Sequence, residues 1–143
     1  MDEDKRKHLD YVQAVITRMN TNSFQLKNMA IVILTAMFAI FATAPKVLLL
    51  FLSVFPLFIF WLLDAYYLQQ ERKFRAMYND IAGLTNQYVI KTYDMTLTNY
   101  NGNGCSFSES FGSKTIFWFY FPLLLIIISI SIILLLVIKI PIL

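Results

Sequence analysis

Two long stretches almost without charge constrain this chain more than any other feature. Residues 28–63 contain a single charged side chain, Lys46, and residues 115–138 contain none. A helix needs about 20 predominantly apolar residues to cross the hydrocarbon core of a bilayer. The first stretch is therefore long enough for two short crossings and the second for one. The sequence predicts an all-α integral membrane protein with three transmembrane helices.

The composition agrees with this class. Hydrophobic residues make up 58% of the 143 residues, whereas about 45–50% is usual in soluble domains. The N-terminus is charged and shows no apolar signal sequence, so we expect the first crossing to act as its own insertion signal. The only cysteine, Cys105, has no partner for an intrachain disulfide and no metal-ligand pattern around it. We expect it to be a reduced thiol.

Two helices are expected before the turn at residues 43–46, which connects the first two transmembrane helices. Apolar residues at helical spacing predict an amphipathic helix over residues 1–22 that lies on the membrane or packs in an oligomer. Asn22 with Gln25 three residues later resembles a capping box, so a helix start is expected there. The first transmembrane helix then covers residues 24–44. The apolar residues of the amphipathic helix are Leu9, Val12, Ile16 and Met19.

The second transmembrane helix is expected to be longer than the bilayer is thick. Pro45 disfavours helix at the residue before it and suits the first turn of a new helix, which predicts a helix over residues 45–82. Pro56 removes one backbone donor and predicts a kink that could act as a hinge. Gly83 is the next strong stop. About 37 residues give roughly 55 Å of helix, and only about 30 Å of that is hydrocarbon, so the helix must project into water.

The remaining segments differ in character. Residues 84–114 contain strand-favouring Tyr, Val, Ile and Thr together with the turn sequence NGNG, which predicts a small β-hairpin-like or irregular element. This element is too small for a core of its own and must pack on the projecting helix or on another subunit. The third transmembrane helix covers residues 115–138 and opens with an aromatic belt.

The distribution of basic residues predicts the orientation. Five Lys or Arg residues lie before the first crossing and five lie in residues 64–114, which is ten of the twelve in the chain; Lys46 and Lys139 remain for the other side. Cytoplasmic segments carry the excess of basic residues. We therefore expect the N-terminus and the central segment in the cytoplasm and the C-terminus outside.

Asp64 is the most conspicuous single residue, because it directly follows the apolar run of the second helix. One interpretation makes it the hydrated end of that helix at headgroup level. The other turns it inward in an oligomer, where repeated copies form a ring of carboxylates at the mouth of a cation pore.

A basic run follows Asp64 on the same helix. Such a run is usually a solvated face, but Lys and Arg are also the residues that contact phosphates, and aromatic side chains hold single strands by stacking. The basic run could therefore bind lipid headgroups, a nucleotide or a nucleic-acid strand, with tyrosines beside it. The candidate ligand-binding residues are Arg72, Lys73, Arg75, Tyr78 and Lys91.

The sequence offers little for catalysis. His8 is the only histidine, and no phosphate-binding glycine loop, metal cluster or serine nucleophile elbow is present in the sequence. We predict that the chain is not an enzyme and uses neither a metal nor a cofactor.

Two stretches of the chain resemble a known family. The pattern ITRM-x-x-NSF-x-LK and the pattern LDAYYL-x-QER-x-FR-x-x-Y, which together span roughly residues 7–81, are similar to small bacterial membrane proteins encoded in anti-phage defence loci, most closely the membrane effector of the Hailong system. The resemblance implies a homo-oligomeric ion channel in the bacterial inner membrane, held closed by a nucleic-acid oligomer that a partner nucleotidyltransferase makes. The residues after Gly83 do not share the family pattern.

Three functions remain open at this stage. The first is an oligomeric channel, expected as a tetramer, whose opening depolarises the membrane when a single-stranded DNA oligomer is lost. The second is a non-conducting membrane adaptor that holds a cytoplasmic defence protein through residues 64–114. The third is a membrane-disrupting toxin.

Overall fold

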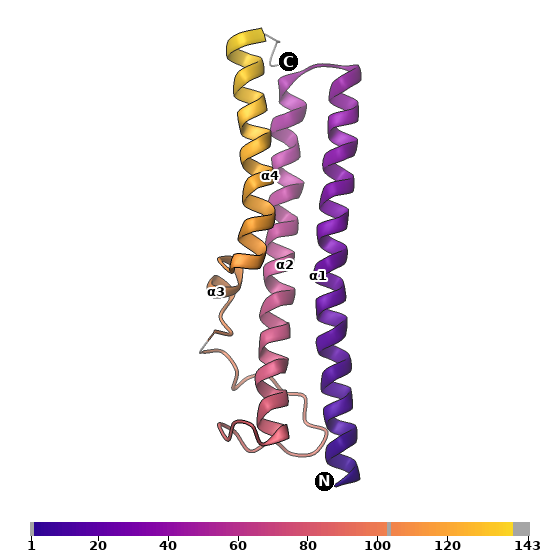
Figure 1. Ribbon diagram of the computed structural model, residues 1–143, viewed down its shortest axis with the longest axis vertical. Helices are drawn as coiled ribbons and strands as arrows, with labels where there is room; N and C mark the ends of the chain where they lie inside the picture. The colour runs from indigo at the N-terminus through magenta and orange to yellow at the C-terminus, as the bar shows by residue number, and fades with distance from the viewer. Residues whose placement is uncertain (1, 103, 139–143) are drawn as a thin grey trace.

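Three long helices lie side by side in the computed structural model, which describes residues 2–102 and 104–138 (Figure 1). Helix α2 is central and packs against α1, α4 and the short helix α3. A π-helical turn, Leu134–Ile138, extends α4, and the described residues contain no β-strand. Lys139 lies outside the described residues. The helices are α1 (Glu3–Thr43), α2 (Val47–Ala82), α3 (Phe107–Phe111) and α4 (Lys114–Ile133).

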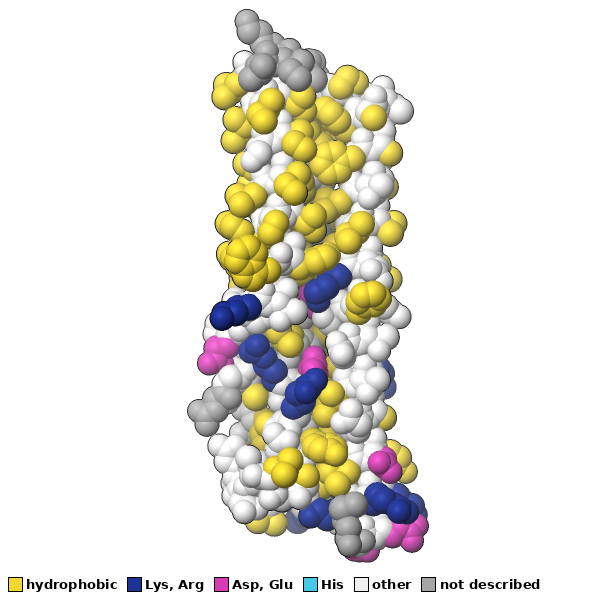
Figure 2. Space-filling view, viewed as in Figure 1, with side chains coloured by type: hydrophobic (Ala, Val, Ile, Leu, Met, Phe, Trp, Pro, Cys, Tyr) yellow, Lys and Arg dark blue, Asp and Glu magenta, His cyan; other side chains and the backbone are white. Residues whose placement is uncertain are grey.

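The molecule divides along its length into two halves (Figure 2). The apolar half consists of residues 28–63 and 115–136, and the polar half consists of residues 2–27 and 64–113 without residue 103. One buried cluster, with Leu50, Leu57 and Tyr120 at its centre, joins the helices of the apolar half. A second cluster in the polar half packs Val12 against Met77. The two clusters give α1 and α2 a common interface along almost their whole length.

The expected helix break near residue 22 is wrong, because α1 is one continuous helix. A break would cost contacts on both sides of it, since Val12 and Ile16 are buried before residue 22 and Ala30 and Leu34 after it. Burying Val12 or Ile16 in the polar half is worth about 1.5–3 kcal/mol for each side chain, whereas a polar residue in a helix costs at most about 0.7 kcal/mol. The interface with α2 therefore overrides the local capping signal.

Helix α2 ends where the sequence predicts. Gly83 follows its last residue with φ of 80°, and its N–H bonds back to the last turn. Glycine adopts this left-handed backbone conformation without steric strain because it has no Cβ. Pro56 lies inside α2, and the helix continues on both sides of it. Its missing N–H leaves the carbonyl of Leu52 without the usual helical partner.

Of the two forms expected for residues 84–114, the described residues show the irregular one and not the β-hairpin. The described part of this segment forms turns and the short helix α3 instead of strands. An isolated two-stranded hairpin is at best marginally stable, and here the backbone is held by α1 and α2. The buried ring of His8 contacts the carbonyl oxygen of Asp94 at 3.1 Å and accepts the N–H of Tyr93 at 3.3 Å.

Asp80 holds the first part of this segment and predicts a dependence on pH. Burial raises the pKa of Asp80, but hydrogen bonds from Thr85, Tyr100 and the Gln87 N–H outweigh it and keep the pKa below its usual value. A carboxyl group with a lowered pKa in the folded state stabilises that state at higher pH, and the stabilisation is lost as pH falls through the folded pKa. We expect the hydrogen-exchange protection of residues 83–100, corrected for intrinsic rates, to fall below about pH 4.

Asp80→Asn is the control for this experiment. It should show weaker protection at neutral pH and little change on acidification. Wild-type protection that stays constant down to about pH 3 would contradict this role of Asp80.

Candidate functional site

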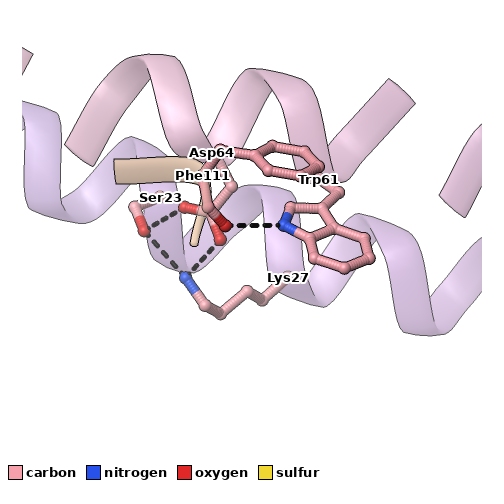
Figure 3. A network of polar contacts seen from close by, with 5 residues as sticks. All are labelled: Ser23, Lys27, Trp61, Asp64 and Phe111. Carbon is pink, nitrogen blue, oxygen red and sulfur yellow. Dashed lines mark hydrogen bonds and ion pairs between the residues drawn. The ribbon is translucent and has the colours of Figure 1, made fainter. Parts of the chain in front are cut away.

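A buried polar network lies at the boundary between the two halves (Figure 3). The boundary network consists of Ser23 and Lys27 from α1 and Asp64 from α2. The ammonium of Lys27 lies 2.5 Å from one carboxylate oxygen of Asp64 and donates to the hydroxyl of Ser23 at 2.8 Å. That hydroxyl donates to the other oxygen of Asp64. The charges of Lys27 and Asp64 therefore neutralise each other where α1 and α2 leave the apolar half, and Ser23 is hydrogen-bonded to both.

Aromatic side chains surround the network. The indole N–H of Trp61, one turn before Asp64, donates to the carbonyl oxygen of Phe111 at 3.2 Å. The Trp61 ring stacks on Phe111, with ring centroids 4.8 Å apart, and on Tyr120 of α4 at 5.9 Å. This cluster fixes α3 and α4 to the same level of α2. All three long helices therefore change from apolar to polar at one level.

Asp64 does not occupy the hydrated environment that one interpretation of the sequence predicts. It has no exposed surface in the subunit, so it is not the hydrated end of the helix. Its carboxylate points to Lys27 rather than to an open face (Figure 3). The ring of carboxylates at a pore mouth stays a prediction, and in the described structure Asp64 is paired with Lys27 of the same chain.

Two of the predicted basic residues are used within the chain. The guanidinium of Arg72 donates to the carbonyl oxygen of Gly104 at 3.1 Å, and the ammonium of Lys73 donates to the side chain of Asn101 at 2.7 Å. These bonds tie Asn101 and Gly104 to α2. Arg72 and Lys73 therefore shape the polar half, and their role in ligand binding stays a prediction.

Arg75 and Tyr78 do come together in one groove. They line a pocket of about 260 Å³ between α1 and α2, with Gln13 and Asn79 beside them. Arg75 is bound to Glu71 one turn earlier at 2.7 Å, but 61% of its side chain remains exposed. Its remaining N–H groups can reach a phosphate, and the Tyr78 ring lies in the same groove. Lys91 is exposed and does not line this groove.

A roomier groove was not predicted from the sequence. It measures about 520 Å³, lies between α1 and α2, and combines Arg18 with Tyr66, Tyr67 and Phe74. Tyr66 is half exposed and packs edge-on against Tyr67 with centroids 5.8 Å apart. A continuous α1 is what brings Arg18 beside these tyrosines. The helical spacing of the α1 residues could have indicated this groove. The groove was missed because a helix break was expected at residue 22.

The structure defines a class of protein. Helices α1, α2 and α4 with its extension are each long and apolar enough to cross a membrane, so the chain is a multi-pass membrane protein with a polar half built on two of its spanning helices. Comparisons with protein-family models, with curated proteins and with solved structures found no match. The resemblance to the Hailong effector therefore stays a prediction.

Proposed function

We propose that the chain is one subunit of an oligomeric ion channel in the bacterial inner membrane, expected as a tetramer. A nucleic-acid oligomer or nucleotide binds the cytoplasmic polar half and holds the channel closed. Loss of the ligand opens the channel and depolarises the cell. The proposed orientation keeps the N-terminus and residues 64–114 in the cytoplasm and the C-terminus outside, as the basic residues favour.

The observation that carries this proposal is the continuity of α1 and α2. Both helices run unbroken from the grooves of the polar half into the apolar half. Their interface is buried along that length, by Val12 and Met77 at one end and by Leu34 and Leu50 at the other. A ligand that binds the closed and open states with different affinity therefore acts on two rigid elements that enter the membrane.

The chemistry of the grooves supports an oligonucleotide as the ligand. One groove combines Arg75 with Tyr78, and the other combines Arg18 with Tyr66 and Tyr67. Single strands bind where cations meet the phosphates and aromatic rings stack on the bases. The two grooves lie on the same pair of helices.

Pro56 is the proposed hinge of α2. Pro56→Ala restores the backbone bond to the Leu52 carbonyl and removes the clash of the proline ring, so the helix becomes stiffer. We expect this variant to bind the oligonucleotide as the wild type does but to conduct fewer ions when the ligand is absent. Ion flux from liposomes, measured beside oligonucleotide affinity, tests this. Unchanged ion flux in Pro56→Ala would contradict the proposal that Pro56 is a hinge.

The function is tested by ion flux through the purified protein in liposomes. A single-stranded DNA oligomer on the side of the polar half should suppress the flux, and washing it out should restore it. Folded, oriented protein that passes no ions under either condition would contradict the proposal. Leakage of large dyes together with ions would instead indicate a membrane disruptor.

One observation favours the adaptor as a second candidate. Leu84 is 74% exposed and Val89 is fully exposed, both in the segment that follows α2. Exposed apolar side chains on a water-facing loop are typical of a contact surface. If the chain passes no ions but captures a cytoplasmic protein, and Val89→Asp abolishes capture, the adaptor is the function.

A further inference from the structure

A pocket at the boundary of the two halves shares Arg75 with the proposed oligonucleotide groove, and the proposed channel function does not use its other lining residues. It measures about 400 Å³ and is lined by residues of α1, α2 and α4, a size within the usual range of ligand pockets. Lys27 closes it toward the apolar half, and Glu71 and Arg75 lie on its polar side. We call it the boundary pocket; its other lining residues are Asn20, Ser23, Phe24, Leu68, Thr115 and Ile116.

The pocket lies where the headgroups of a bilayer would be. The boundary network marks the level at which α1 and α2 change from apolar to polar, and Thr115 is in the first turn of α4. Phe24 and Trp118 are 64% and 72% exposed near this level. Exposed aromatic residues are enriched at the membrane–water interface. A band of charged side chains directly below the apolar half is visible on this face (Figure 2).

The pocket offers donors for a phosphate. Lys27 has three N–H donors, of which two are directed to Ser23 and Asp64. Arg75 bonds to Glu71 through its Nε and one terminal nitrogen, which leaves its other N–H groups available. The Thr115 hydroxyl and the Asn20 amide add neutral donors from α4 and α1.

The pocket also offers one acceptor for a cation. Only Oε1 of Glu71 bonds to Arg75, and Oε2 accepts no hydrogen bond from a described residue. The Glu71 side chain is only 11% exposed, and its Oε2 can accept a hydrogen bond from a ligand in the pocket. Two cations and one carboxylate line the pocket, and Asp64 offsets the charge of Lys27. A site with this balance suits a ligand that carries both signs of charge.

The geometry points to a binding site for the headgroup of phosphatidylethanolamine. Its phosphate lies between Lys27, Arg75 and Thr115, and its ammonium donates to Oε2 of Glu71. Its acyl chains extend along the apolar half. A glycerol headgroup brings the phosphate without the ammonium. A choline headgroup has a quaternary nitrogen without an N–H donor, which favours aromatic faces rather than a single carboxylate oxygen.

Thermal unfolding of the purified protein in detergent tests this site without any readout of channel activity. Short-chain phosphatidylethanolamine, phosphatidylcholine and phosphatidylglycerol with identical acyl chains are titrated separately. We expect the apparent affinity for the ethanolamine lipid to be about tenfold higher than for the other two, because only its ammonium can donate a charge-assisted hydrogen bond to Glu71. Equal affinities for the three lipids would overturn the proposal.

Variants separate the two ends of the headgroup. Glu71→Gln should abolish the preference for ethanolamine over choline, and Arg75→Gln and Thr115→Val should weaken binding of all three lipids. Lys114→Gln is the matched control, because Lys114 is exposed in the first turn of α4 and does not line the pocket. Lys27 is left intact so that Asp64 keeps its partner. A preference for ethanolamine that survives Glu71→Gln would also overturn the proposal.

Soluble ligands distinguish a lipid from a free phosphate compound. Phosphoethanolamine and inorganic phosphate are added to the same protein at the concentrations used for the lipids. Stabilisation by the ethanolamine lipid alone supports a lipid site. Stabilisation of the same size by soluble phosphoethanolamine, lost in Glu71→Gln, would show that the pocket binds a soluble metabolite instead.

Discussion

Replacing Lys27 by methionine is expected to destabilise the protein by about 3–5 kcal/mol, because it leaves Asp64 as an unpaired charge in the interior. Asp64 has no exposed surface, and Lys27 is its only ionic partner in the described residues. Methionine has a length similar to that of lysine, so the change removes the charge and keeps most of the packing. Reversible unfolding in mixed micelles, followed by the fluorescence of Trp61 and Trp118, measures the effect.

The double variant Lys27→Met with Asp64→Leu is the control. A buried ion pair replaced by apolar side chains of similar volume is often neutral or stabilising, so the double variant should recover most of the loss. A Lys27→Met protein as stable as the wild type would contradict the buried pairing. If the double variant is no more stable than the single one, the loss of stability comes from altered packing rather than from the unpaired charge of Asp64.

The second large effect is expected in the groove of Arg75 and Tyr78. Tyr78→Ala should weaken binding of a single-stranded oligonucleotide by about 1–3 kcal/mol, which is the usual value of one stacked base. Arg75→Glu should weaken it further and should lower the slope of log affinity against log salt by about 0.7 for the lost phosphate contact. Fluorescence anisotropy of a labelled oligonucleotide at several salt concentrations measures both.

Lys46→Glu is the matched control for Arg75→Glu. It makes the same change of charge at an exposed residue in the turn between α1 and α2, at the opposite end of the apolar half. Charge reversal at Arg72 or Lys73 is less informative, because these side chains bind Gly104 and Asn101 of the same chain. Equal affinity and salt dependence in wild type, Arg75→Glu and Tyr78→Ala would contradict this groove as the ligand site.

The parts of the fold that depend on local chemistry could be predicted from the sequence. Uncharged stretches gave the number of spanning helices, and Gly83 gave the end of α2, because a left-handed cap favours glycine whatever surrounds it. The length of α2, which exceeds the thickness of a bilayer, could be predicted as well. The role of Asp64 as an ionisable group at the boundary was visible as well, but its partner was not.

The parts that depend on tertiary contacts could not be predicted in this way. The capping pattern at Asn22 does not start a new helix, because the interface between α1 and α2 keeps α1 continuous. The same interface brings Lys27 to Asp64. The strand-favouring residues of 84–113 found no strand partner, because His8 and Asp80 bind their backbone and side chains instead. Both outcomes come from contacts between residues far apart in the sequence.

The most direct measurement of the central claim is ion flux through oriented, folded protein in liposomes, with and without a single-stranded DNA oligomer on the side of the polar half. The account predicts flux without the oligomer, suppression with it, and loss of suppression in Arg75→Glu but not in Lys46→Glu. Flux that the oligomer does not change, or no flux under either condition, would contradict a channel held closed by a nucleic-acid ligand.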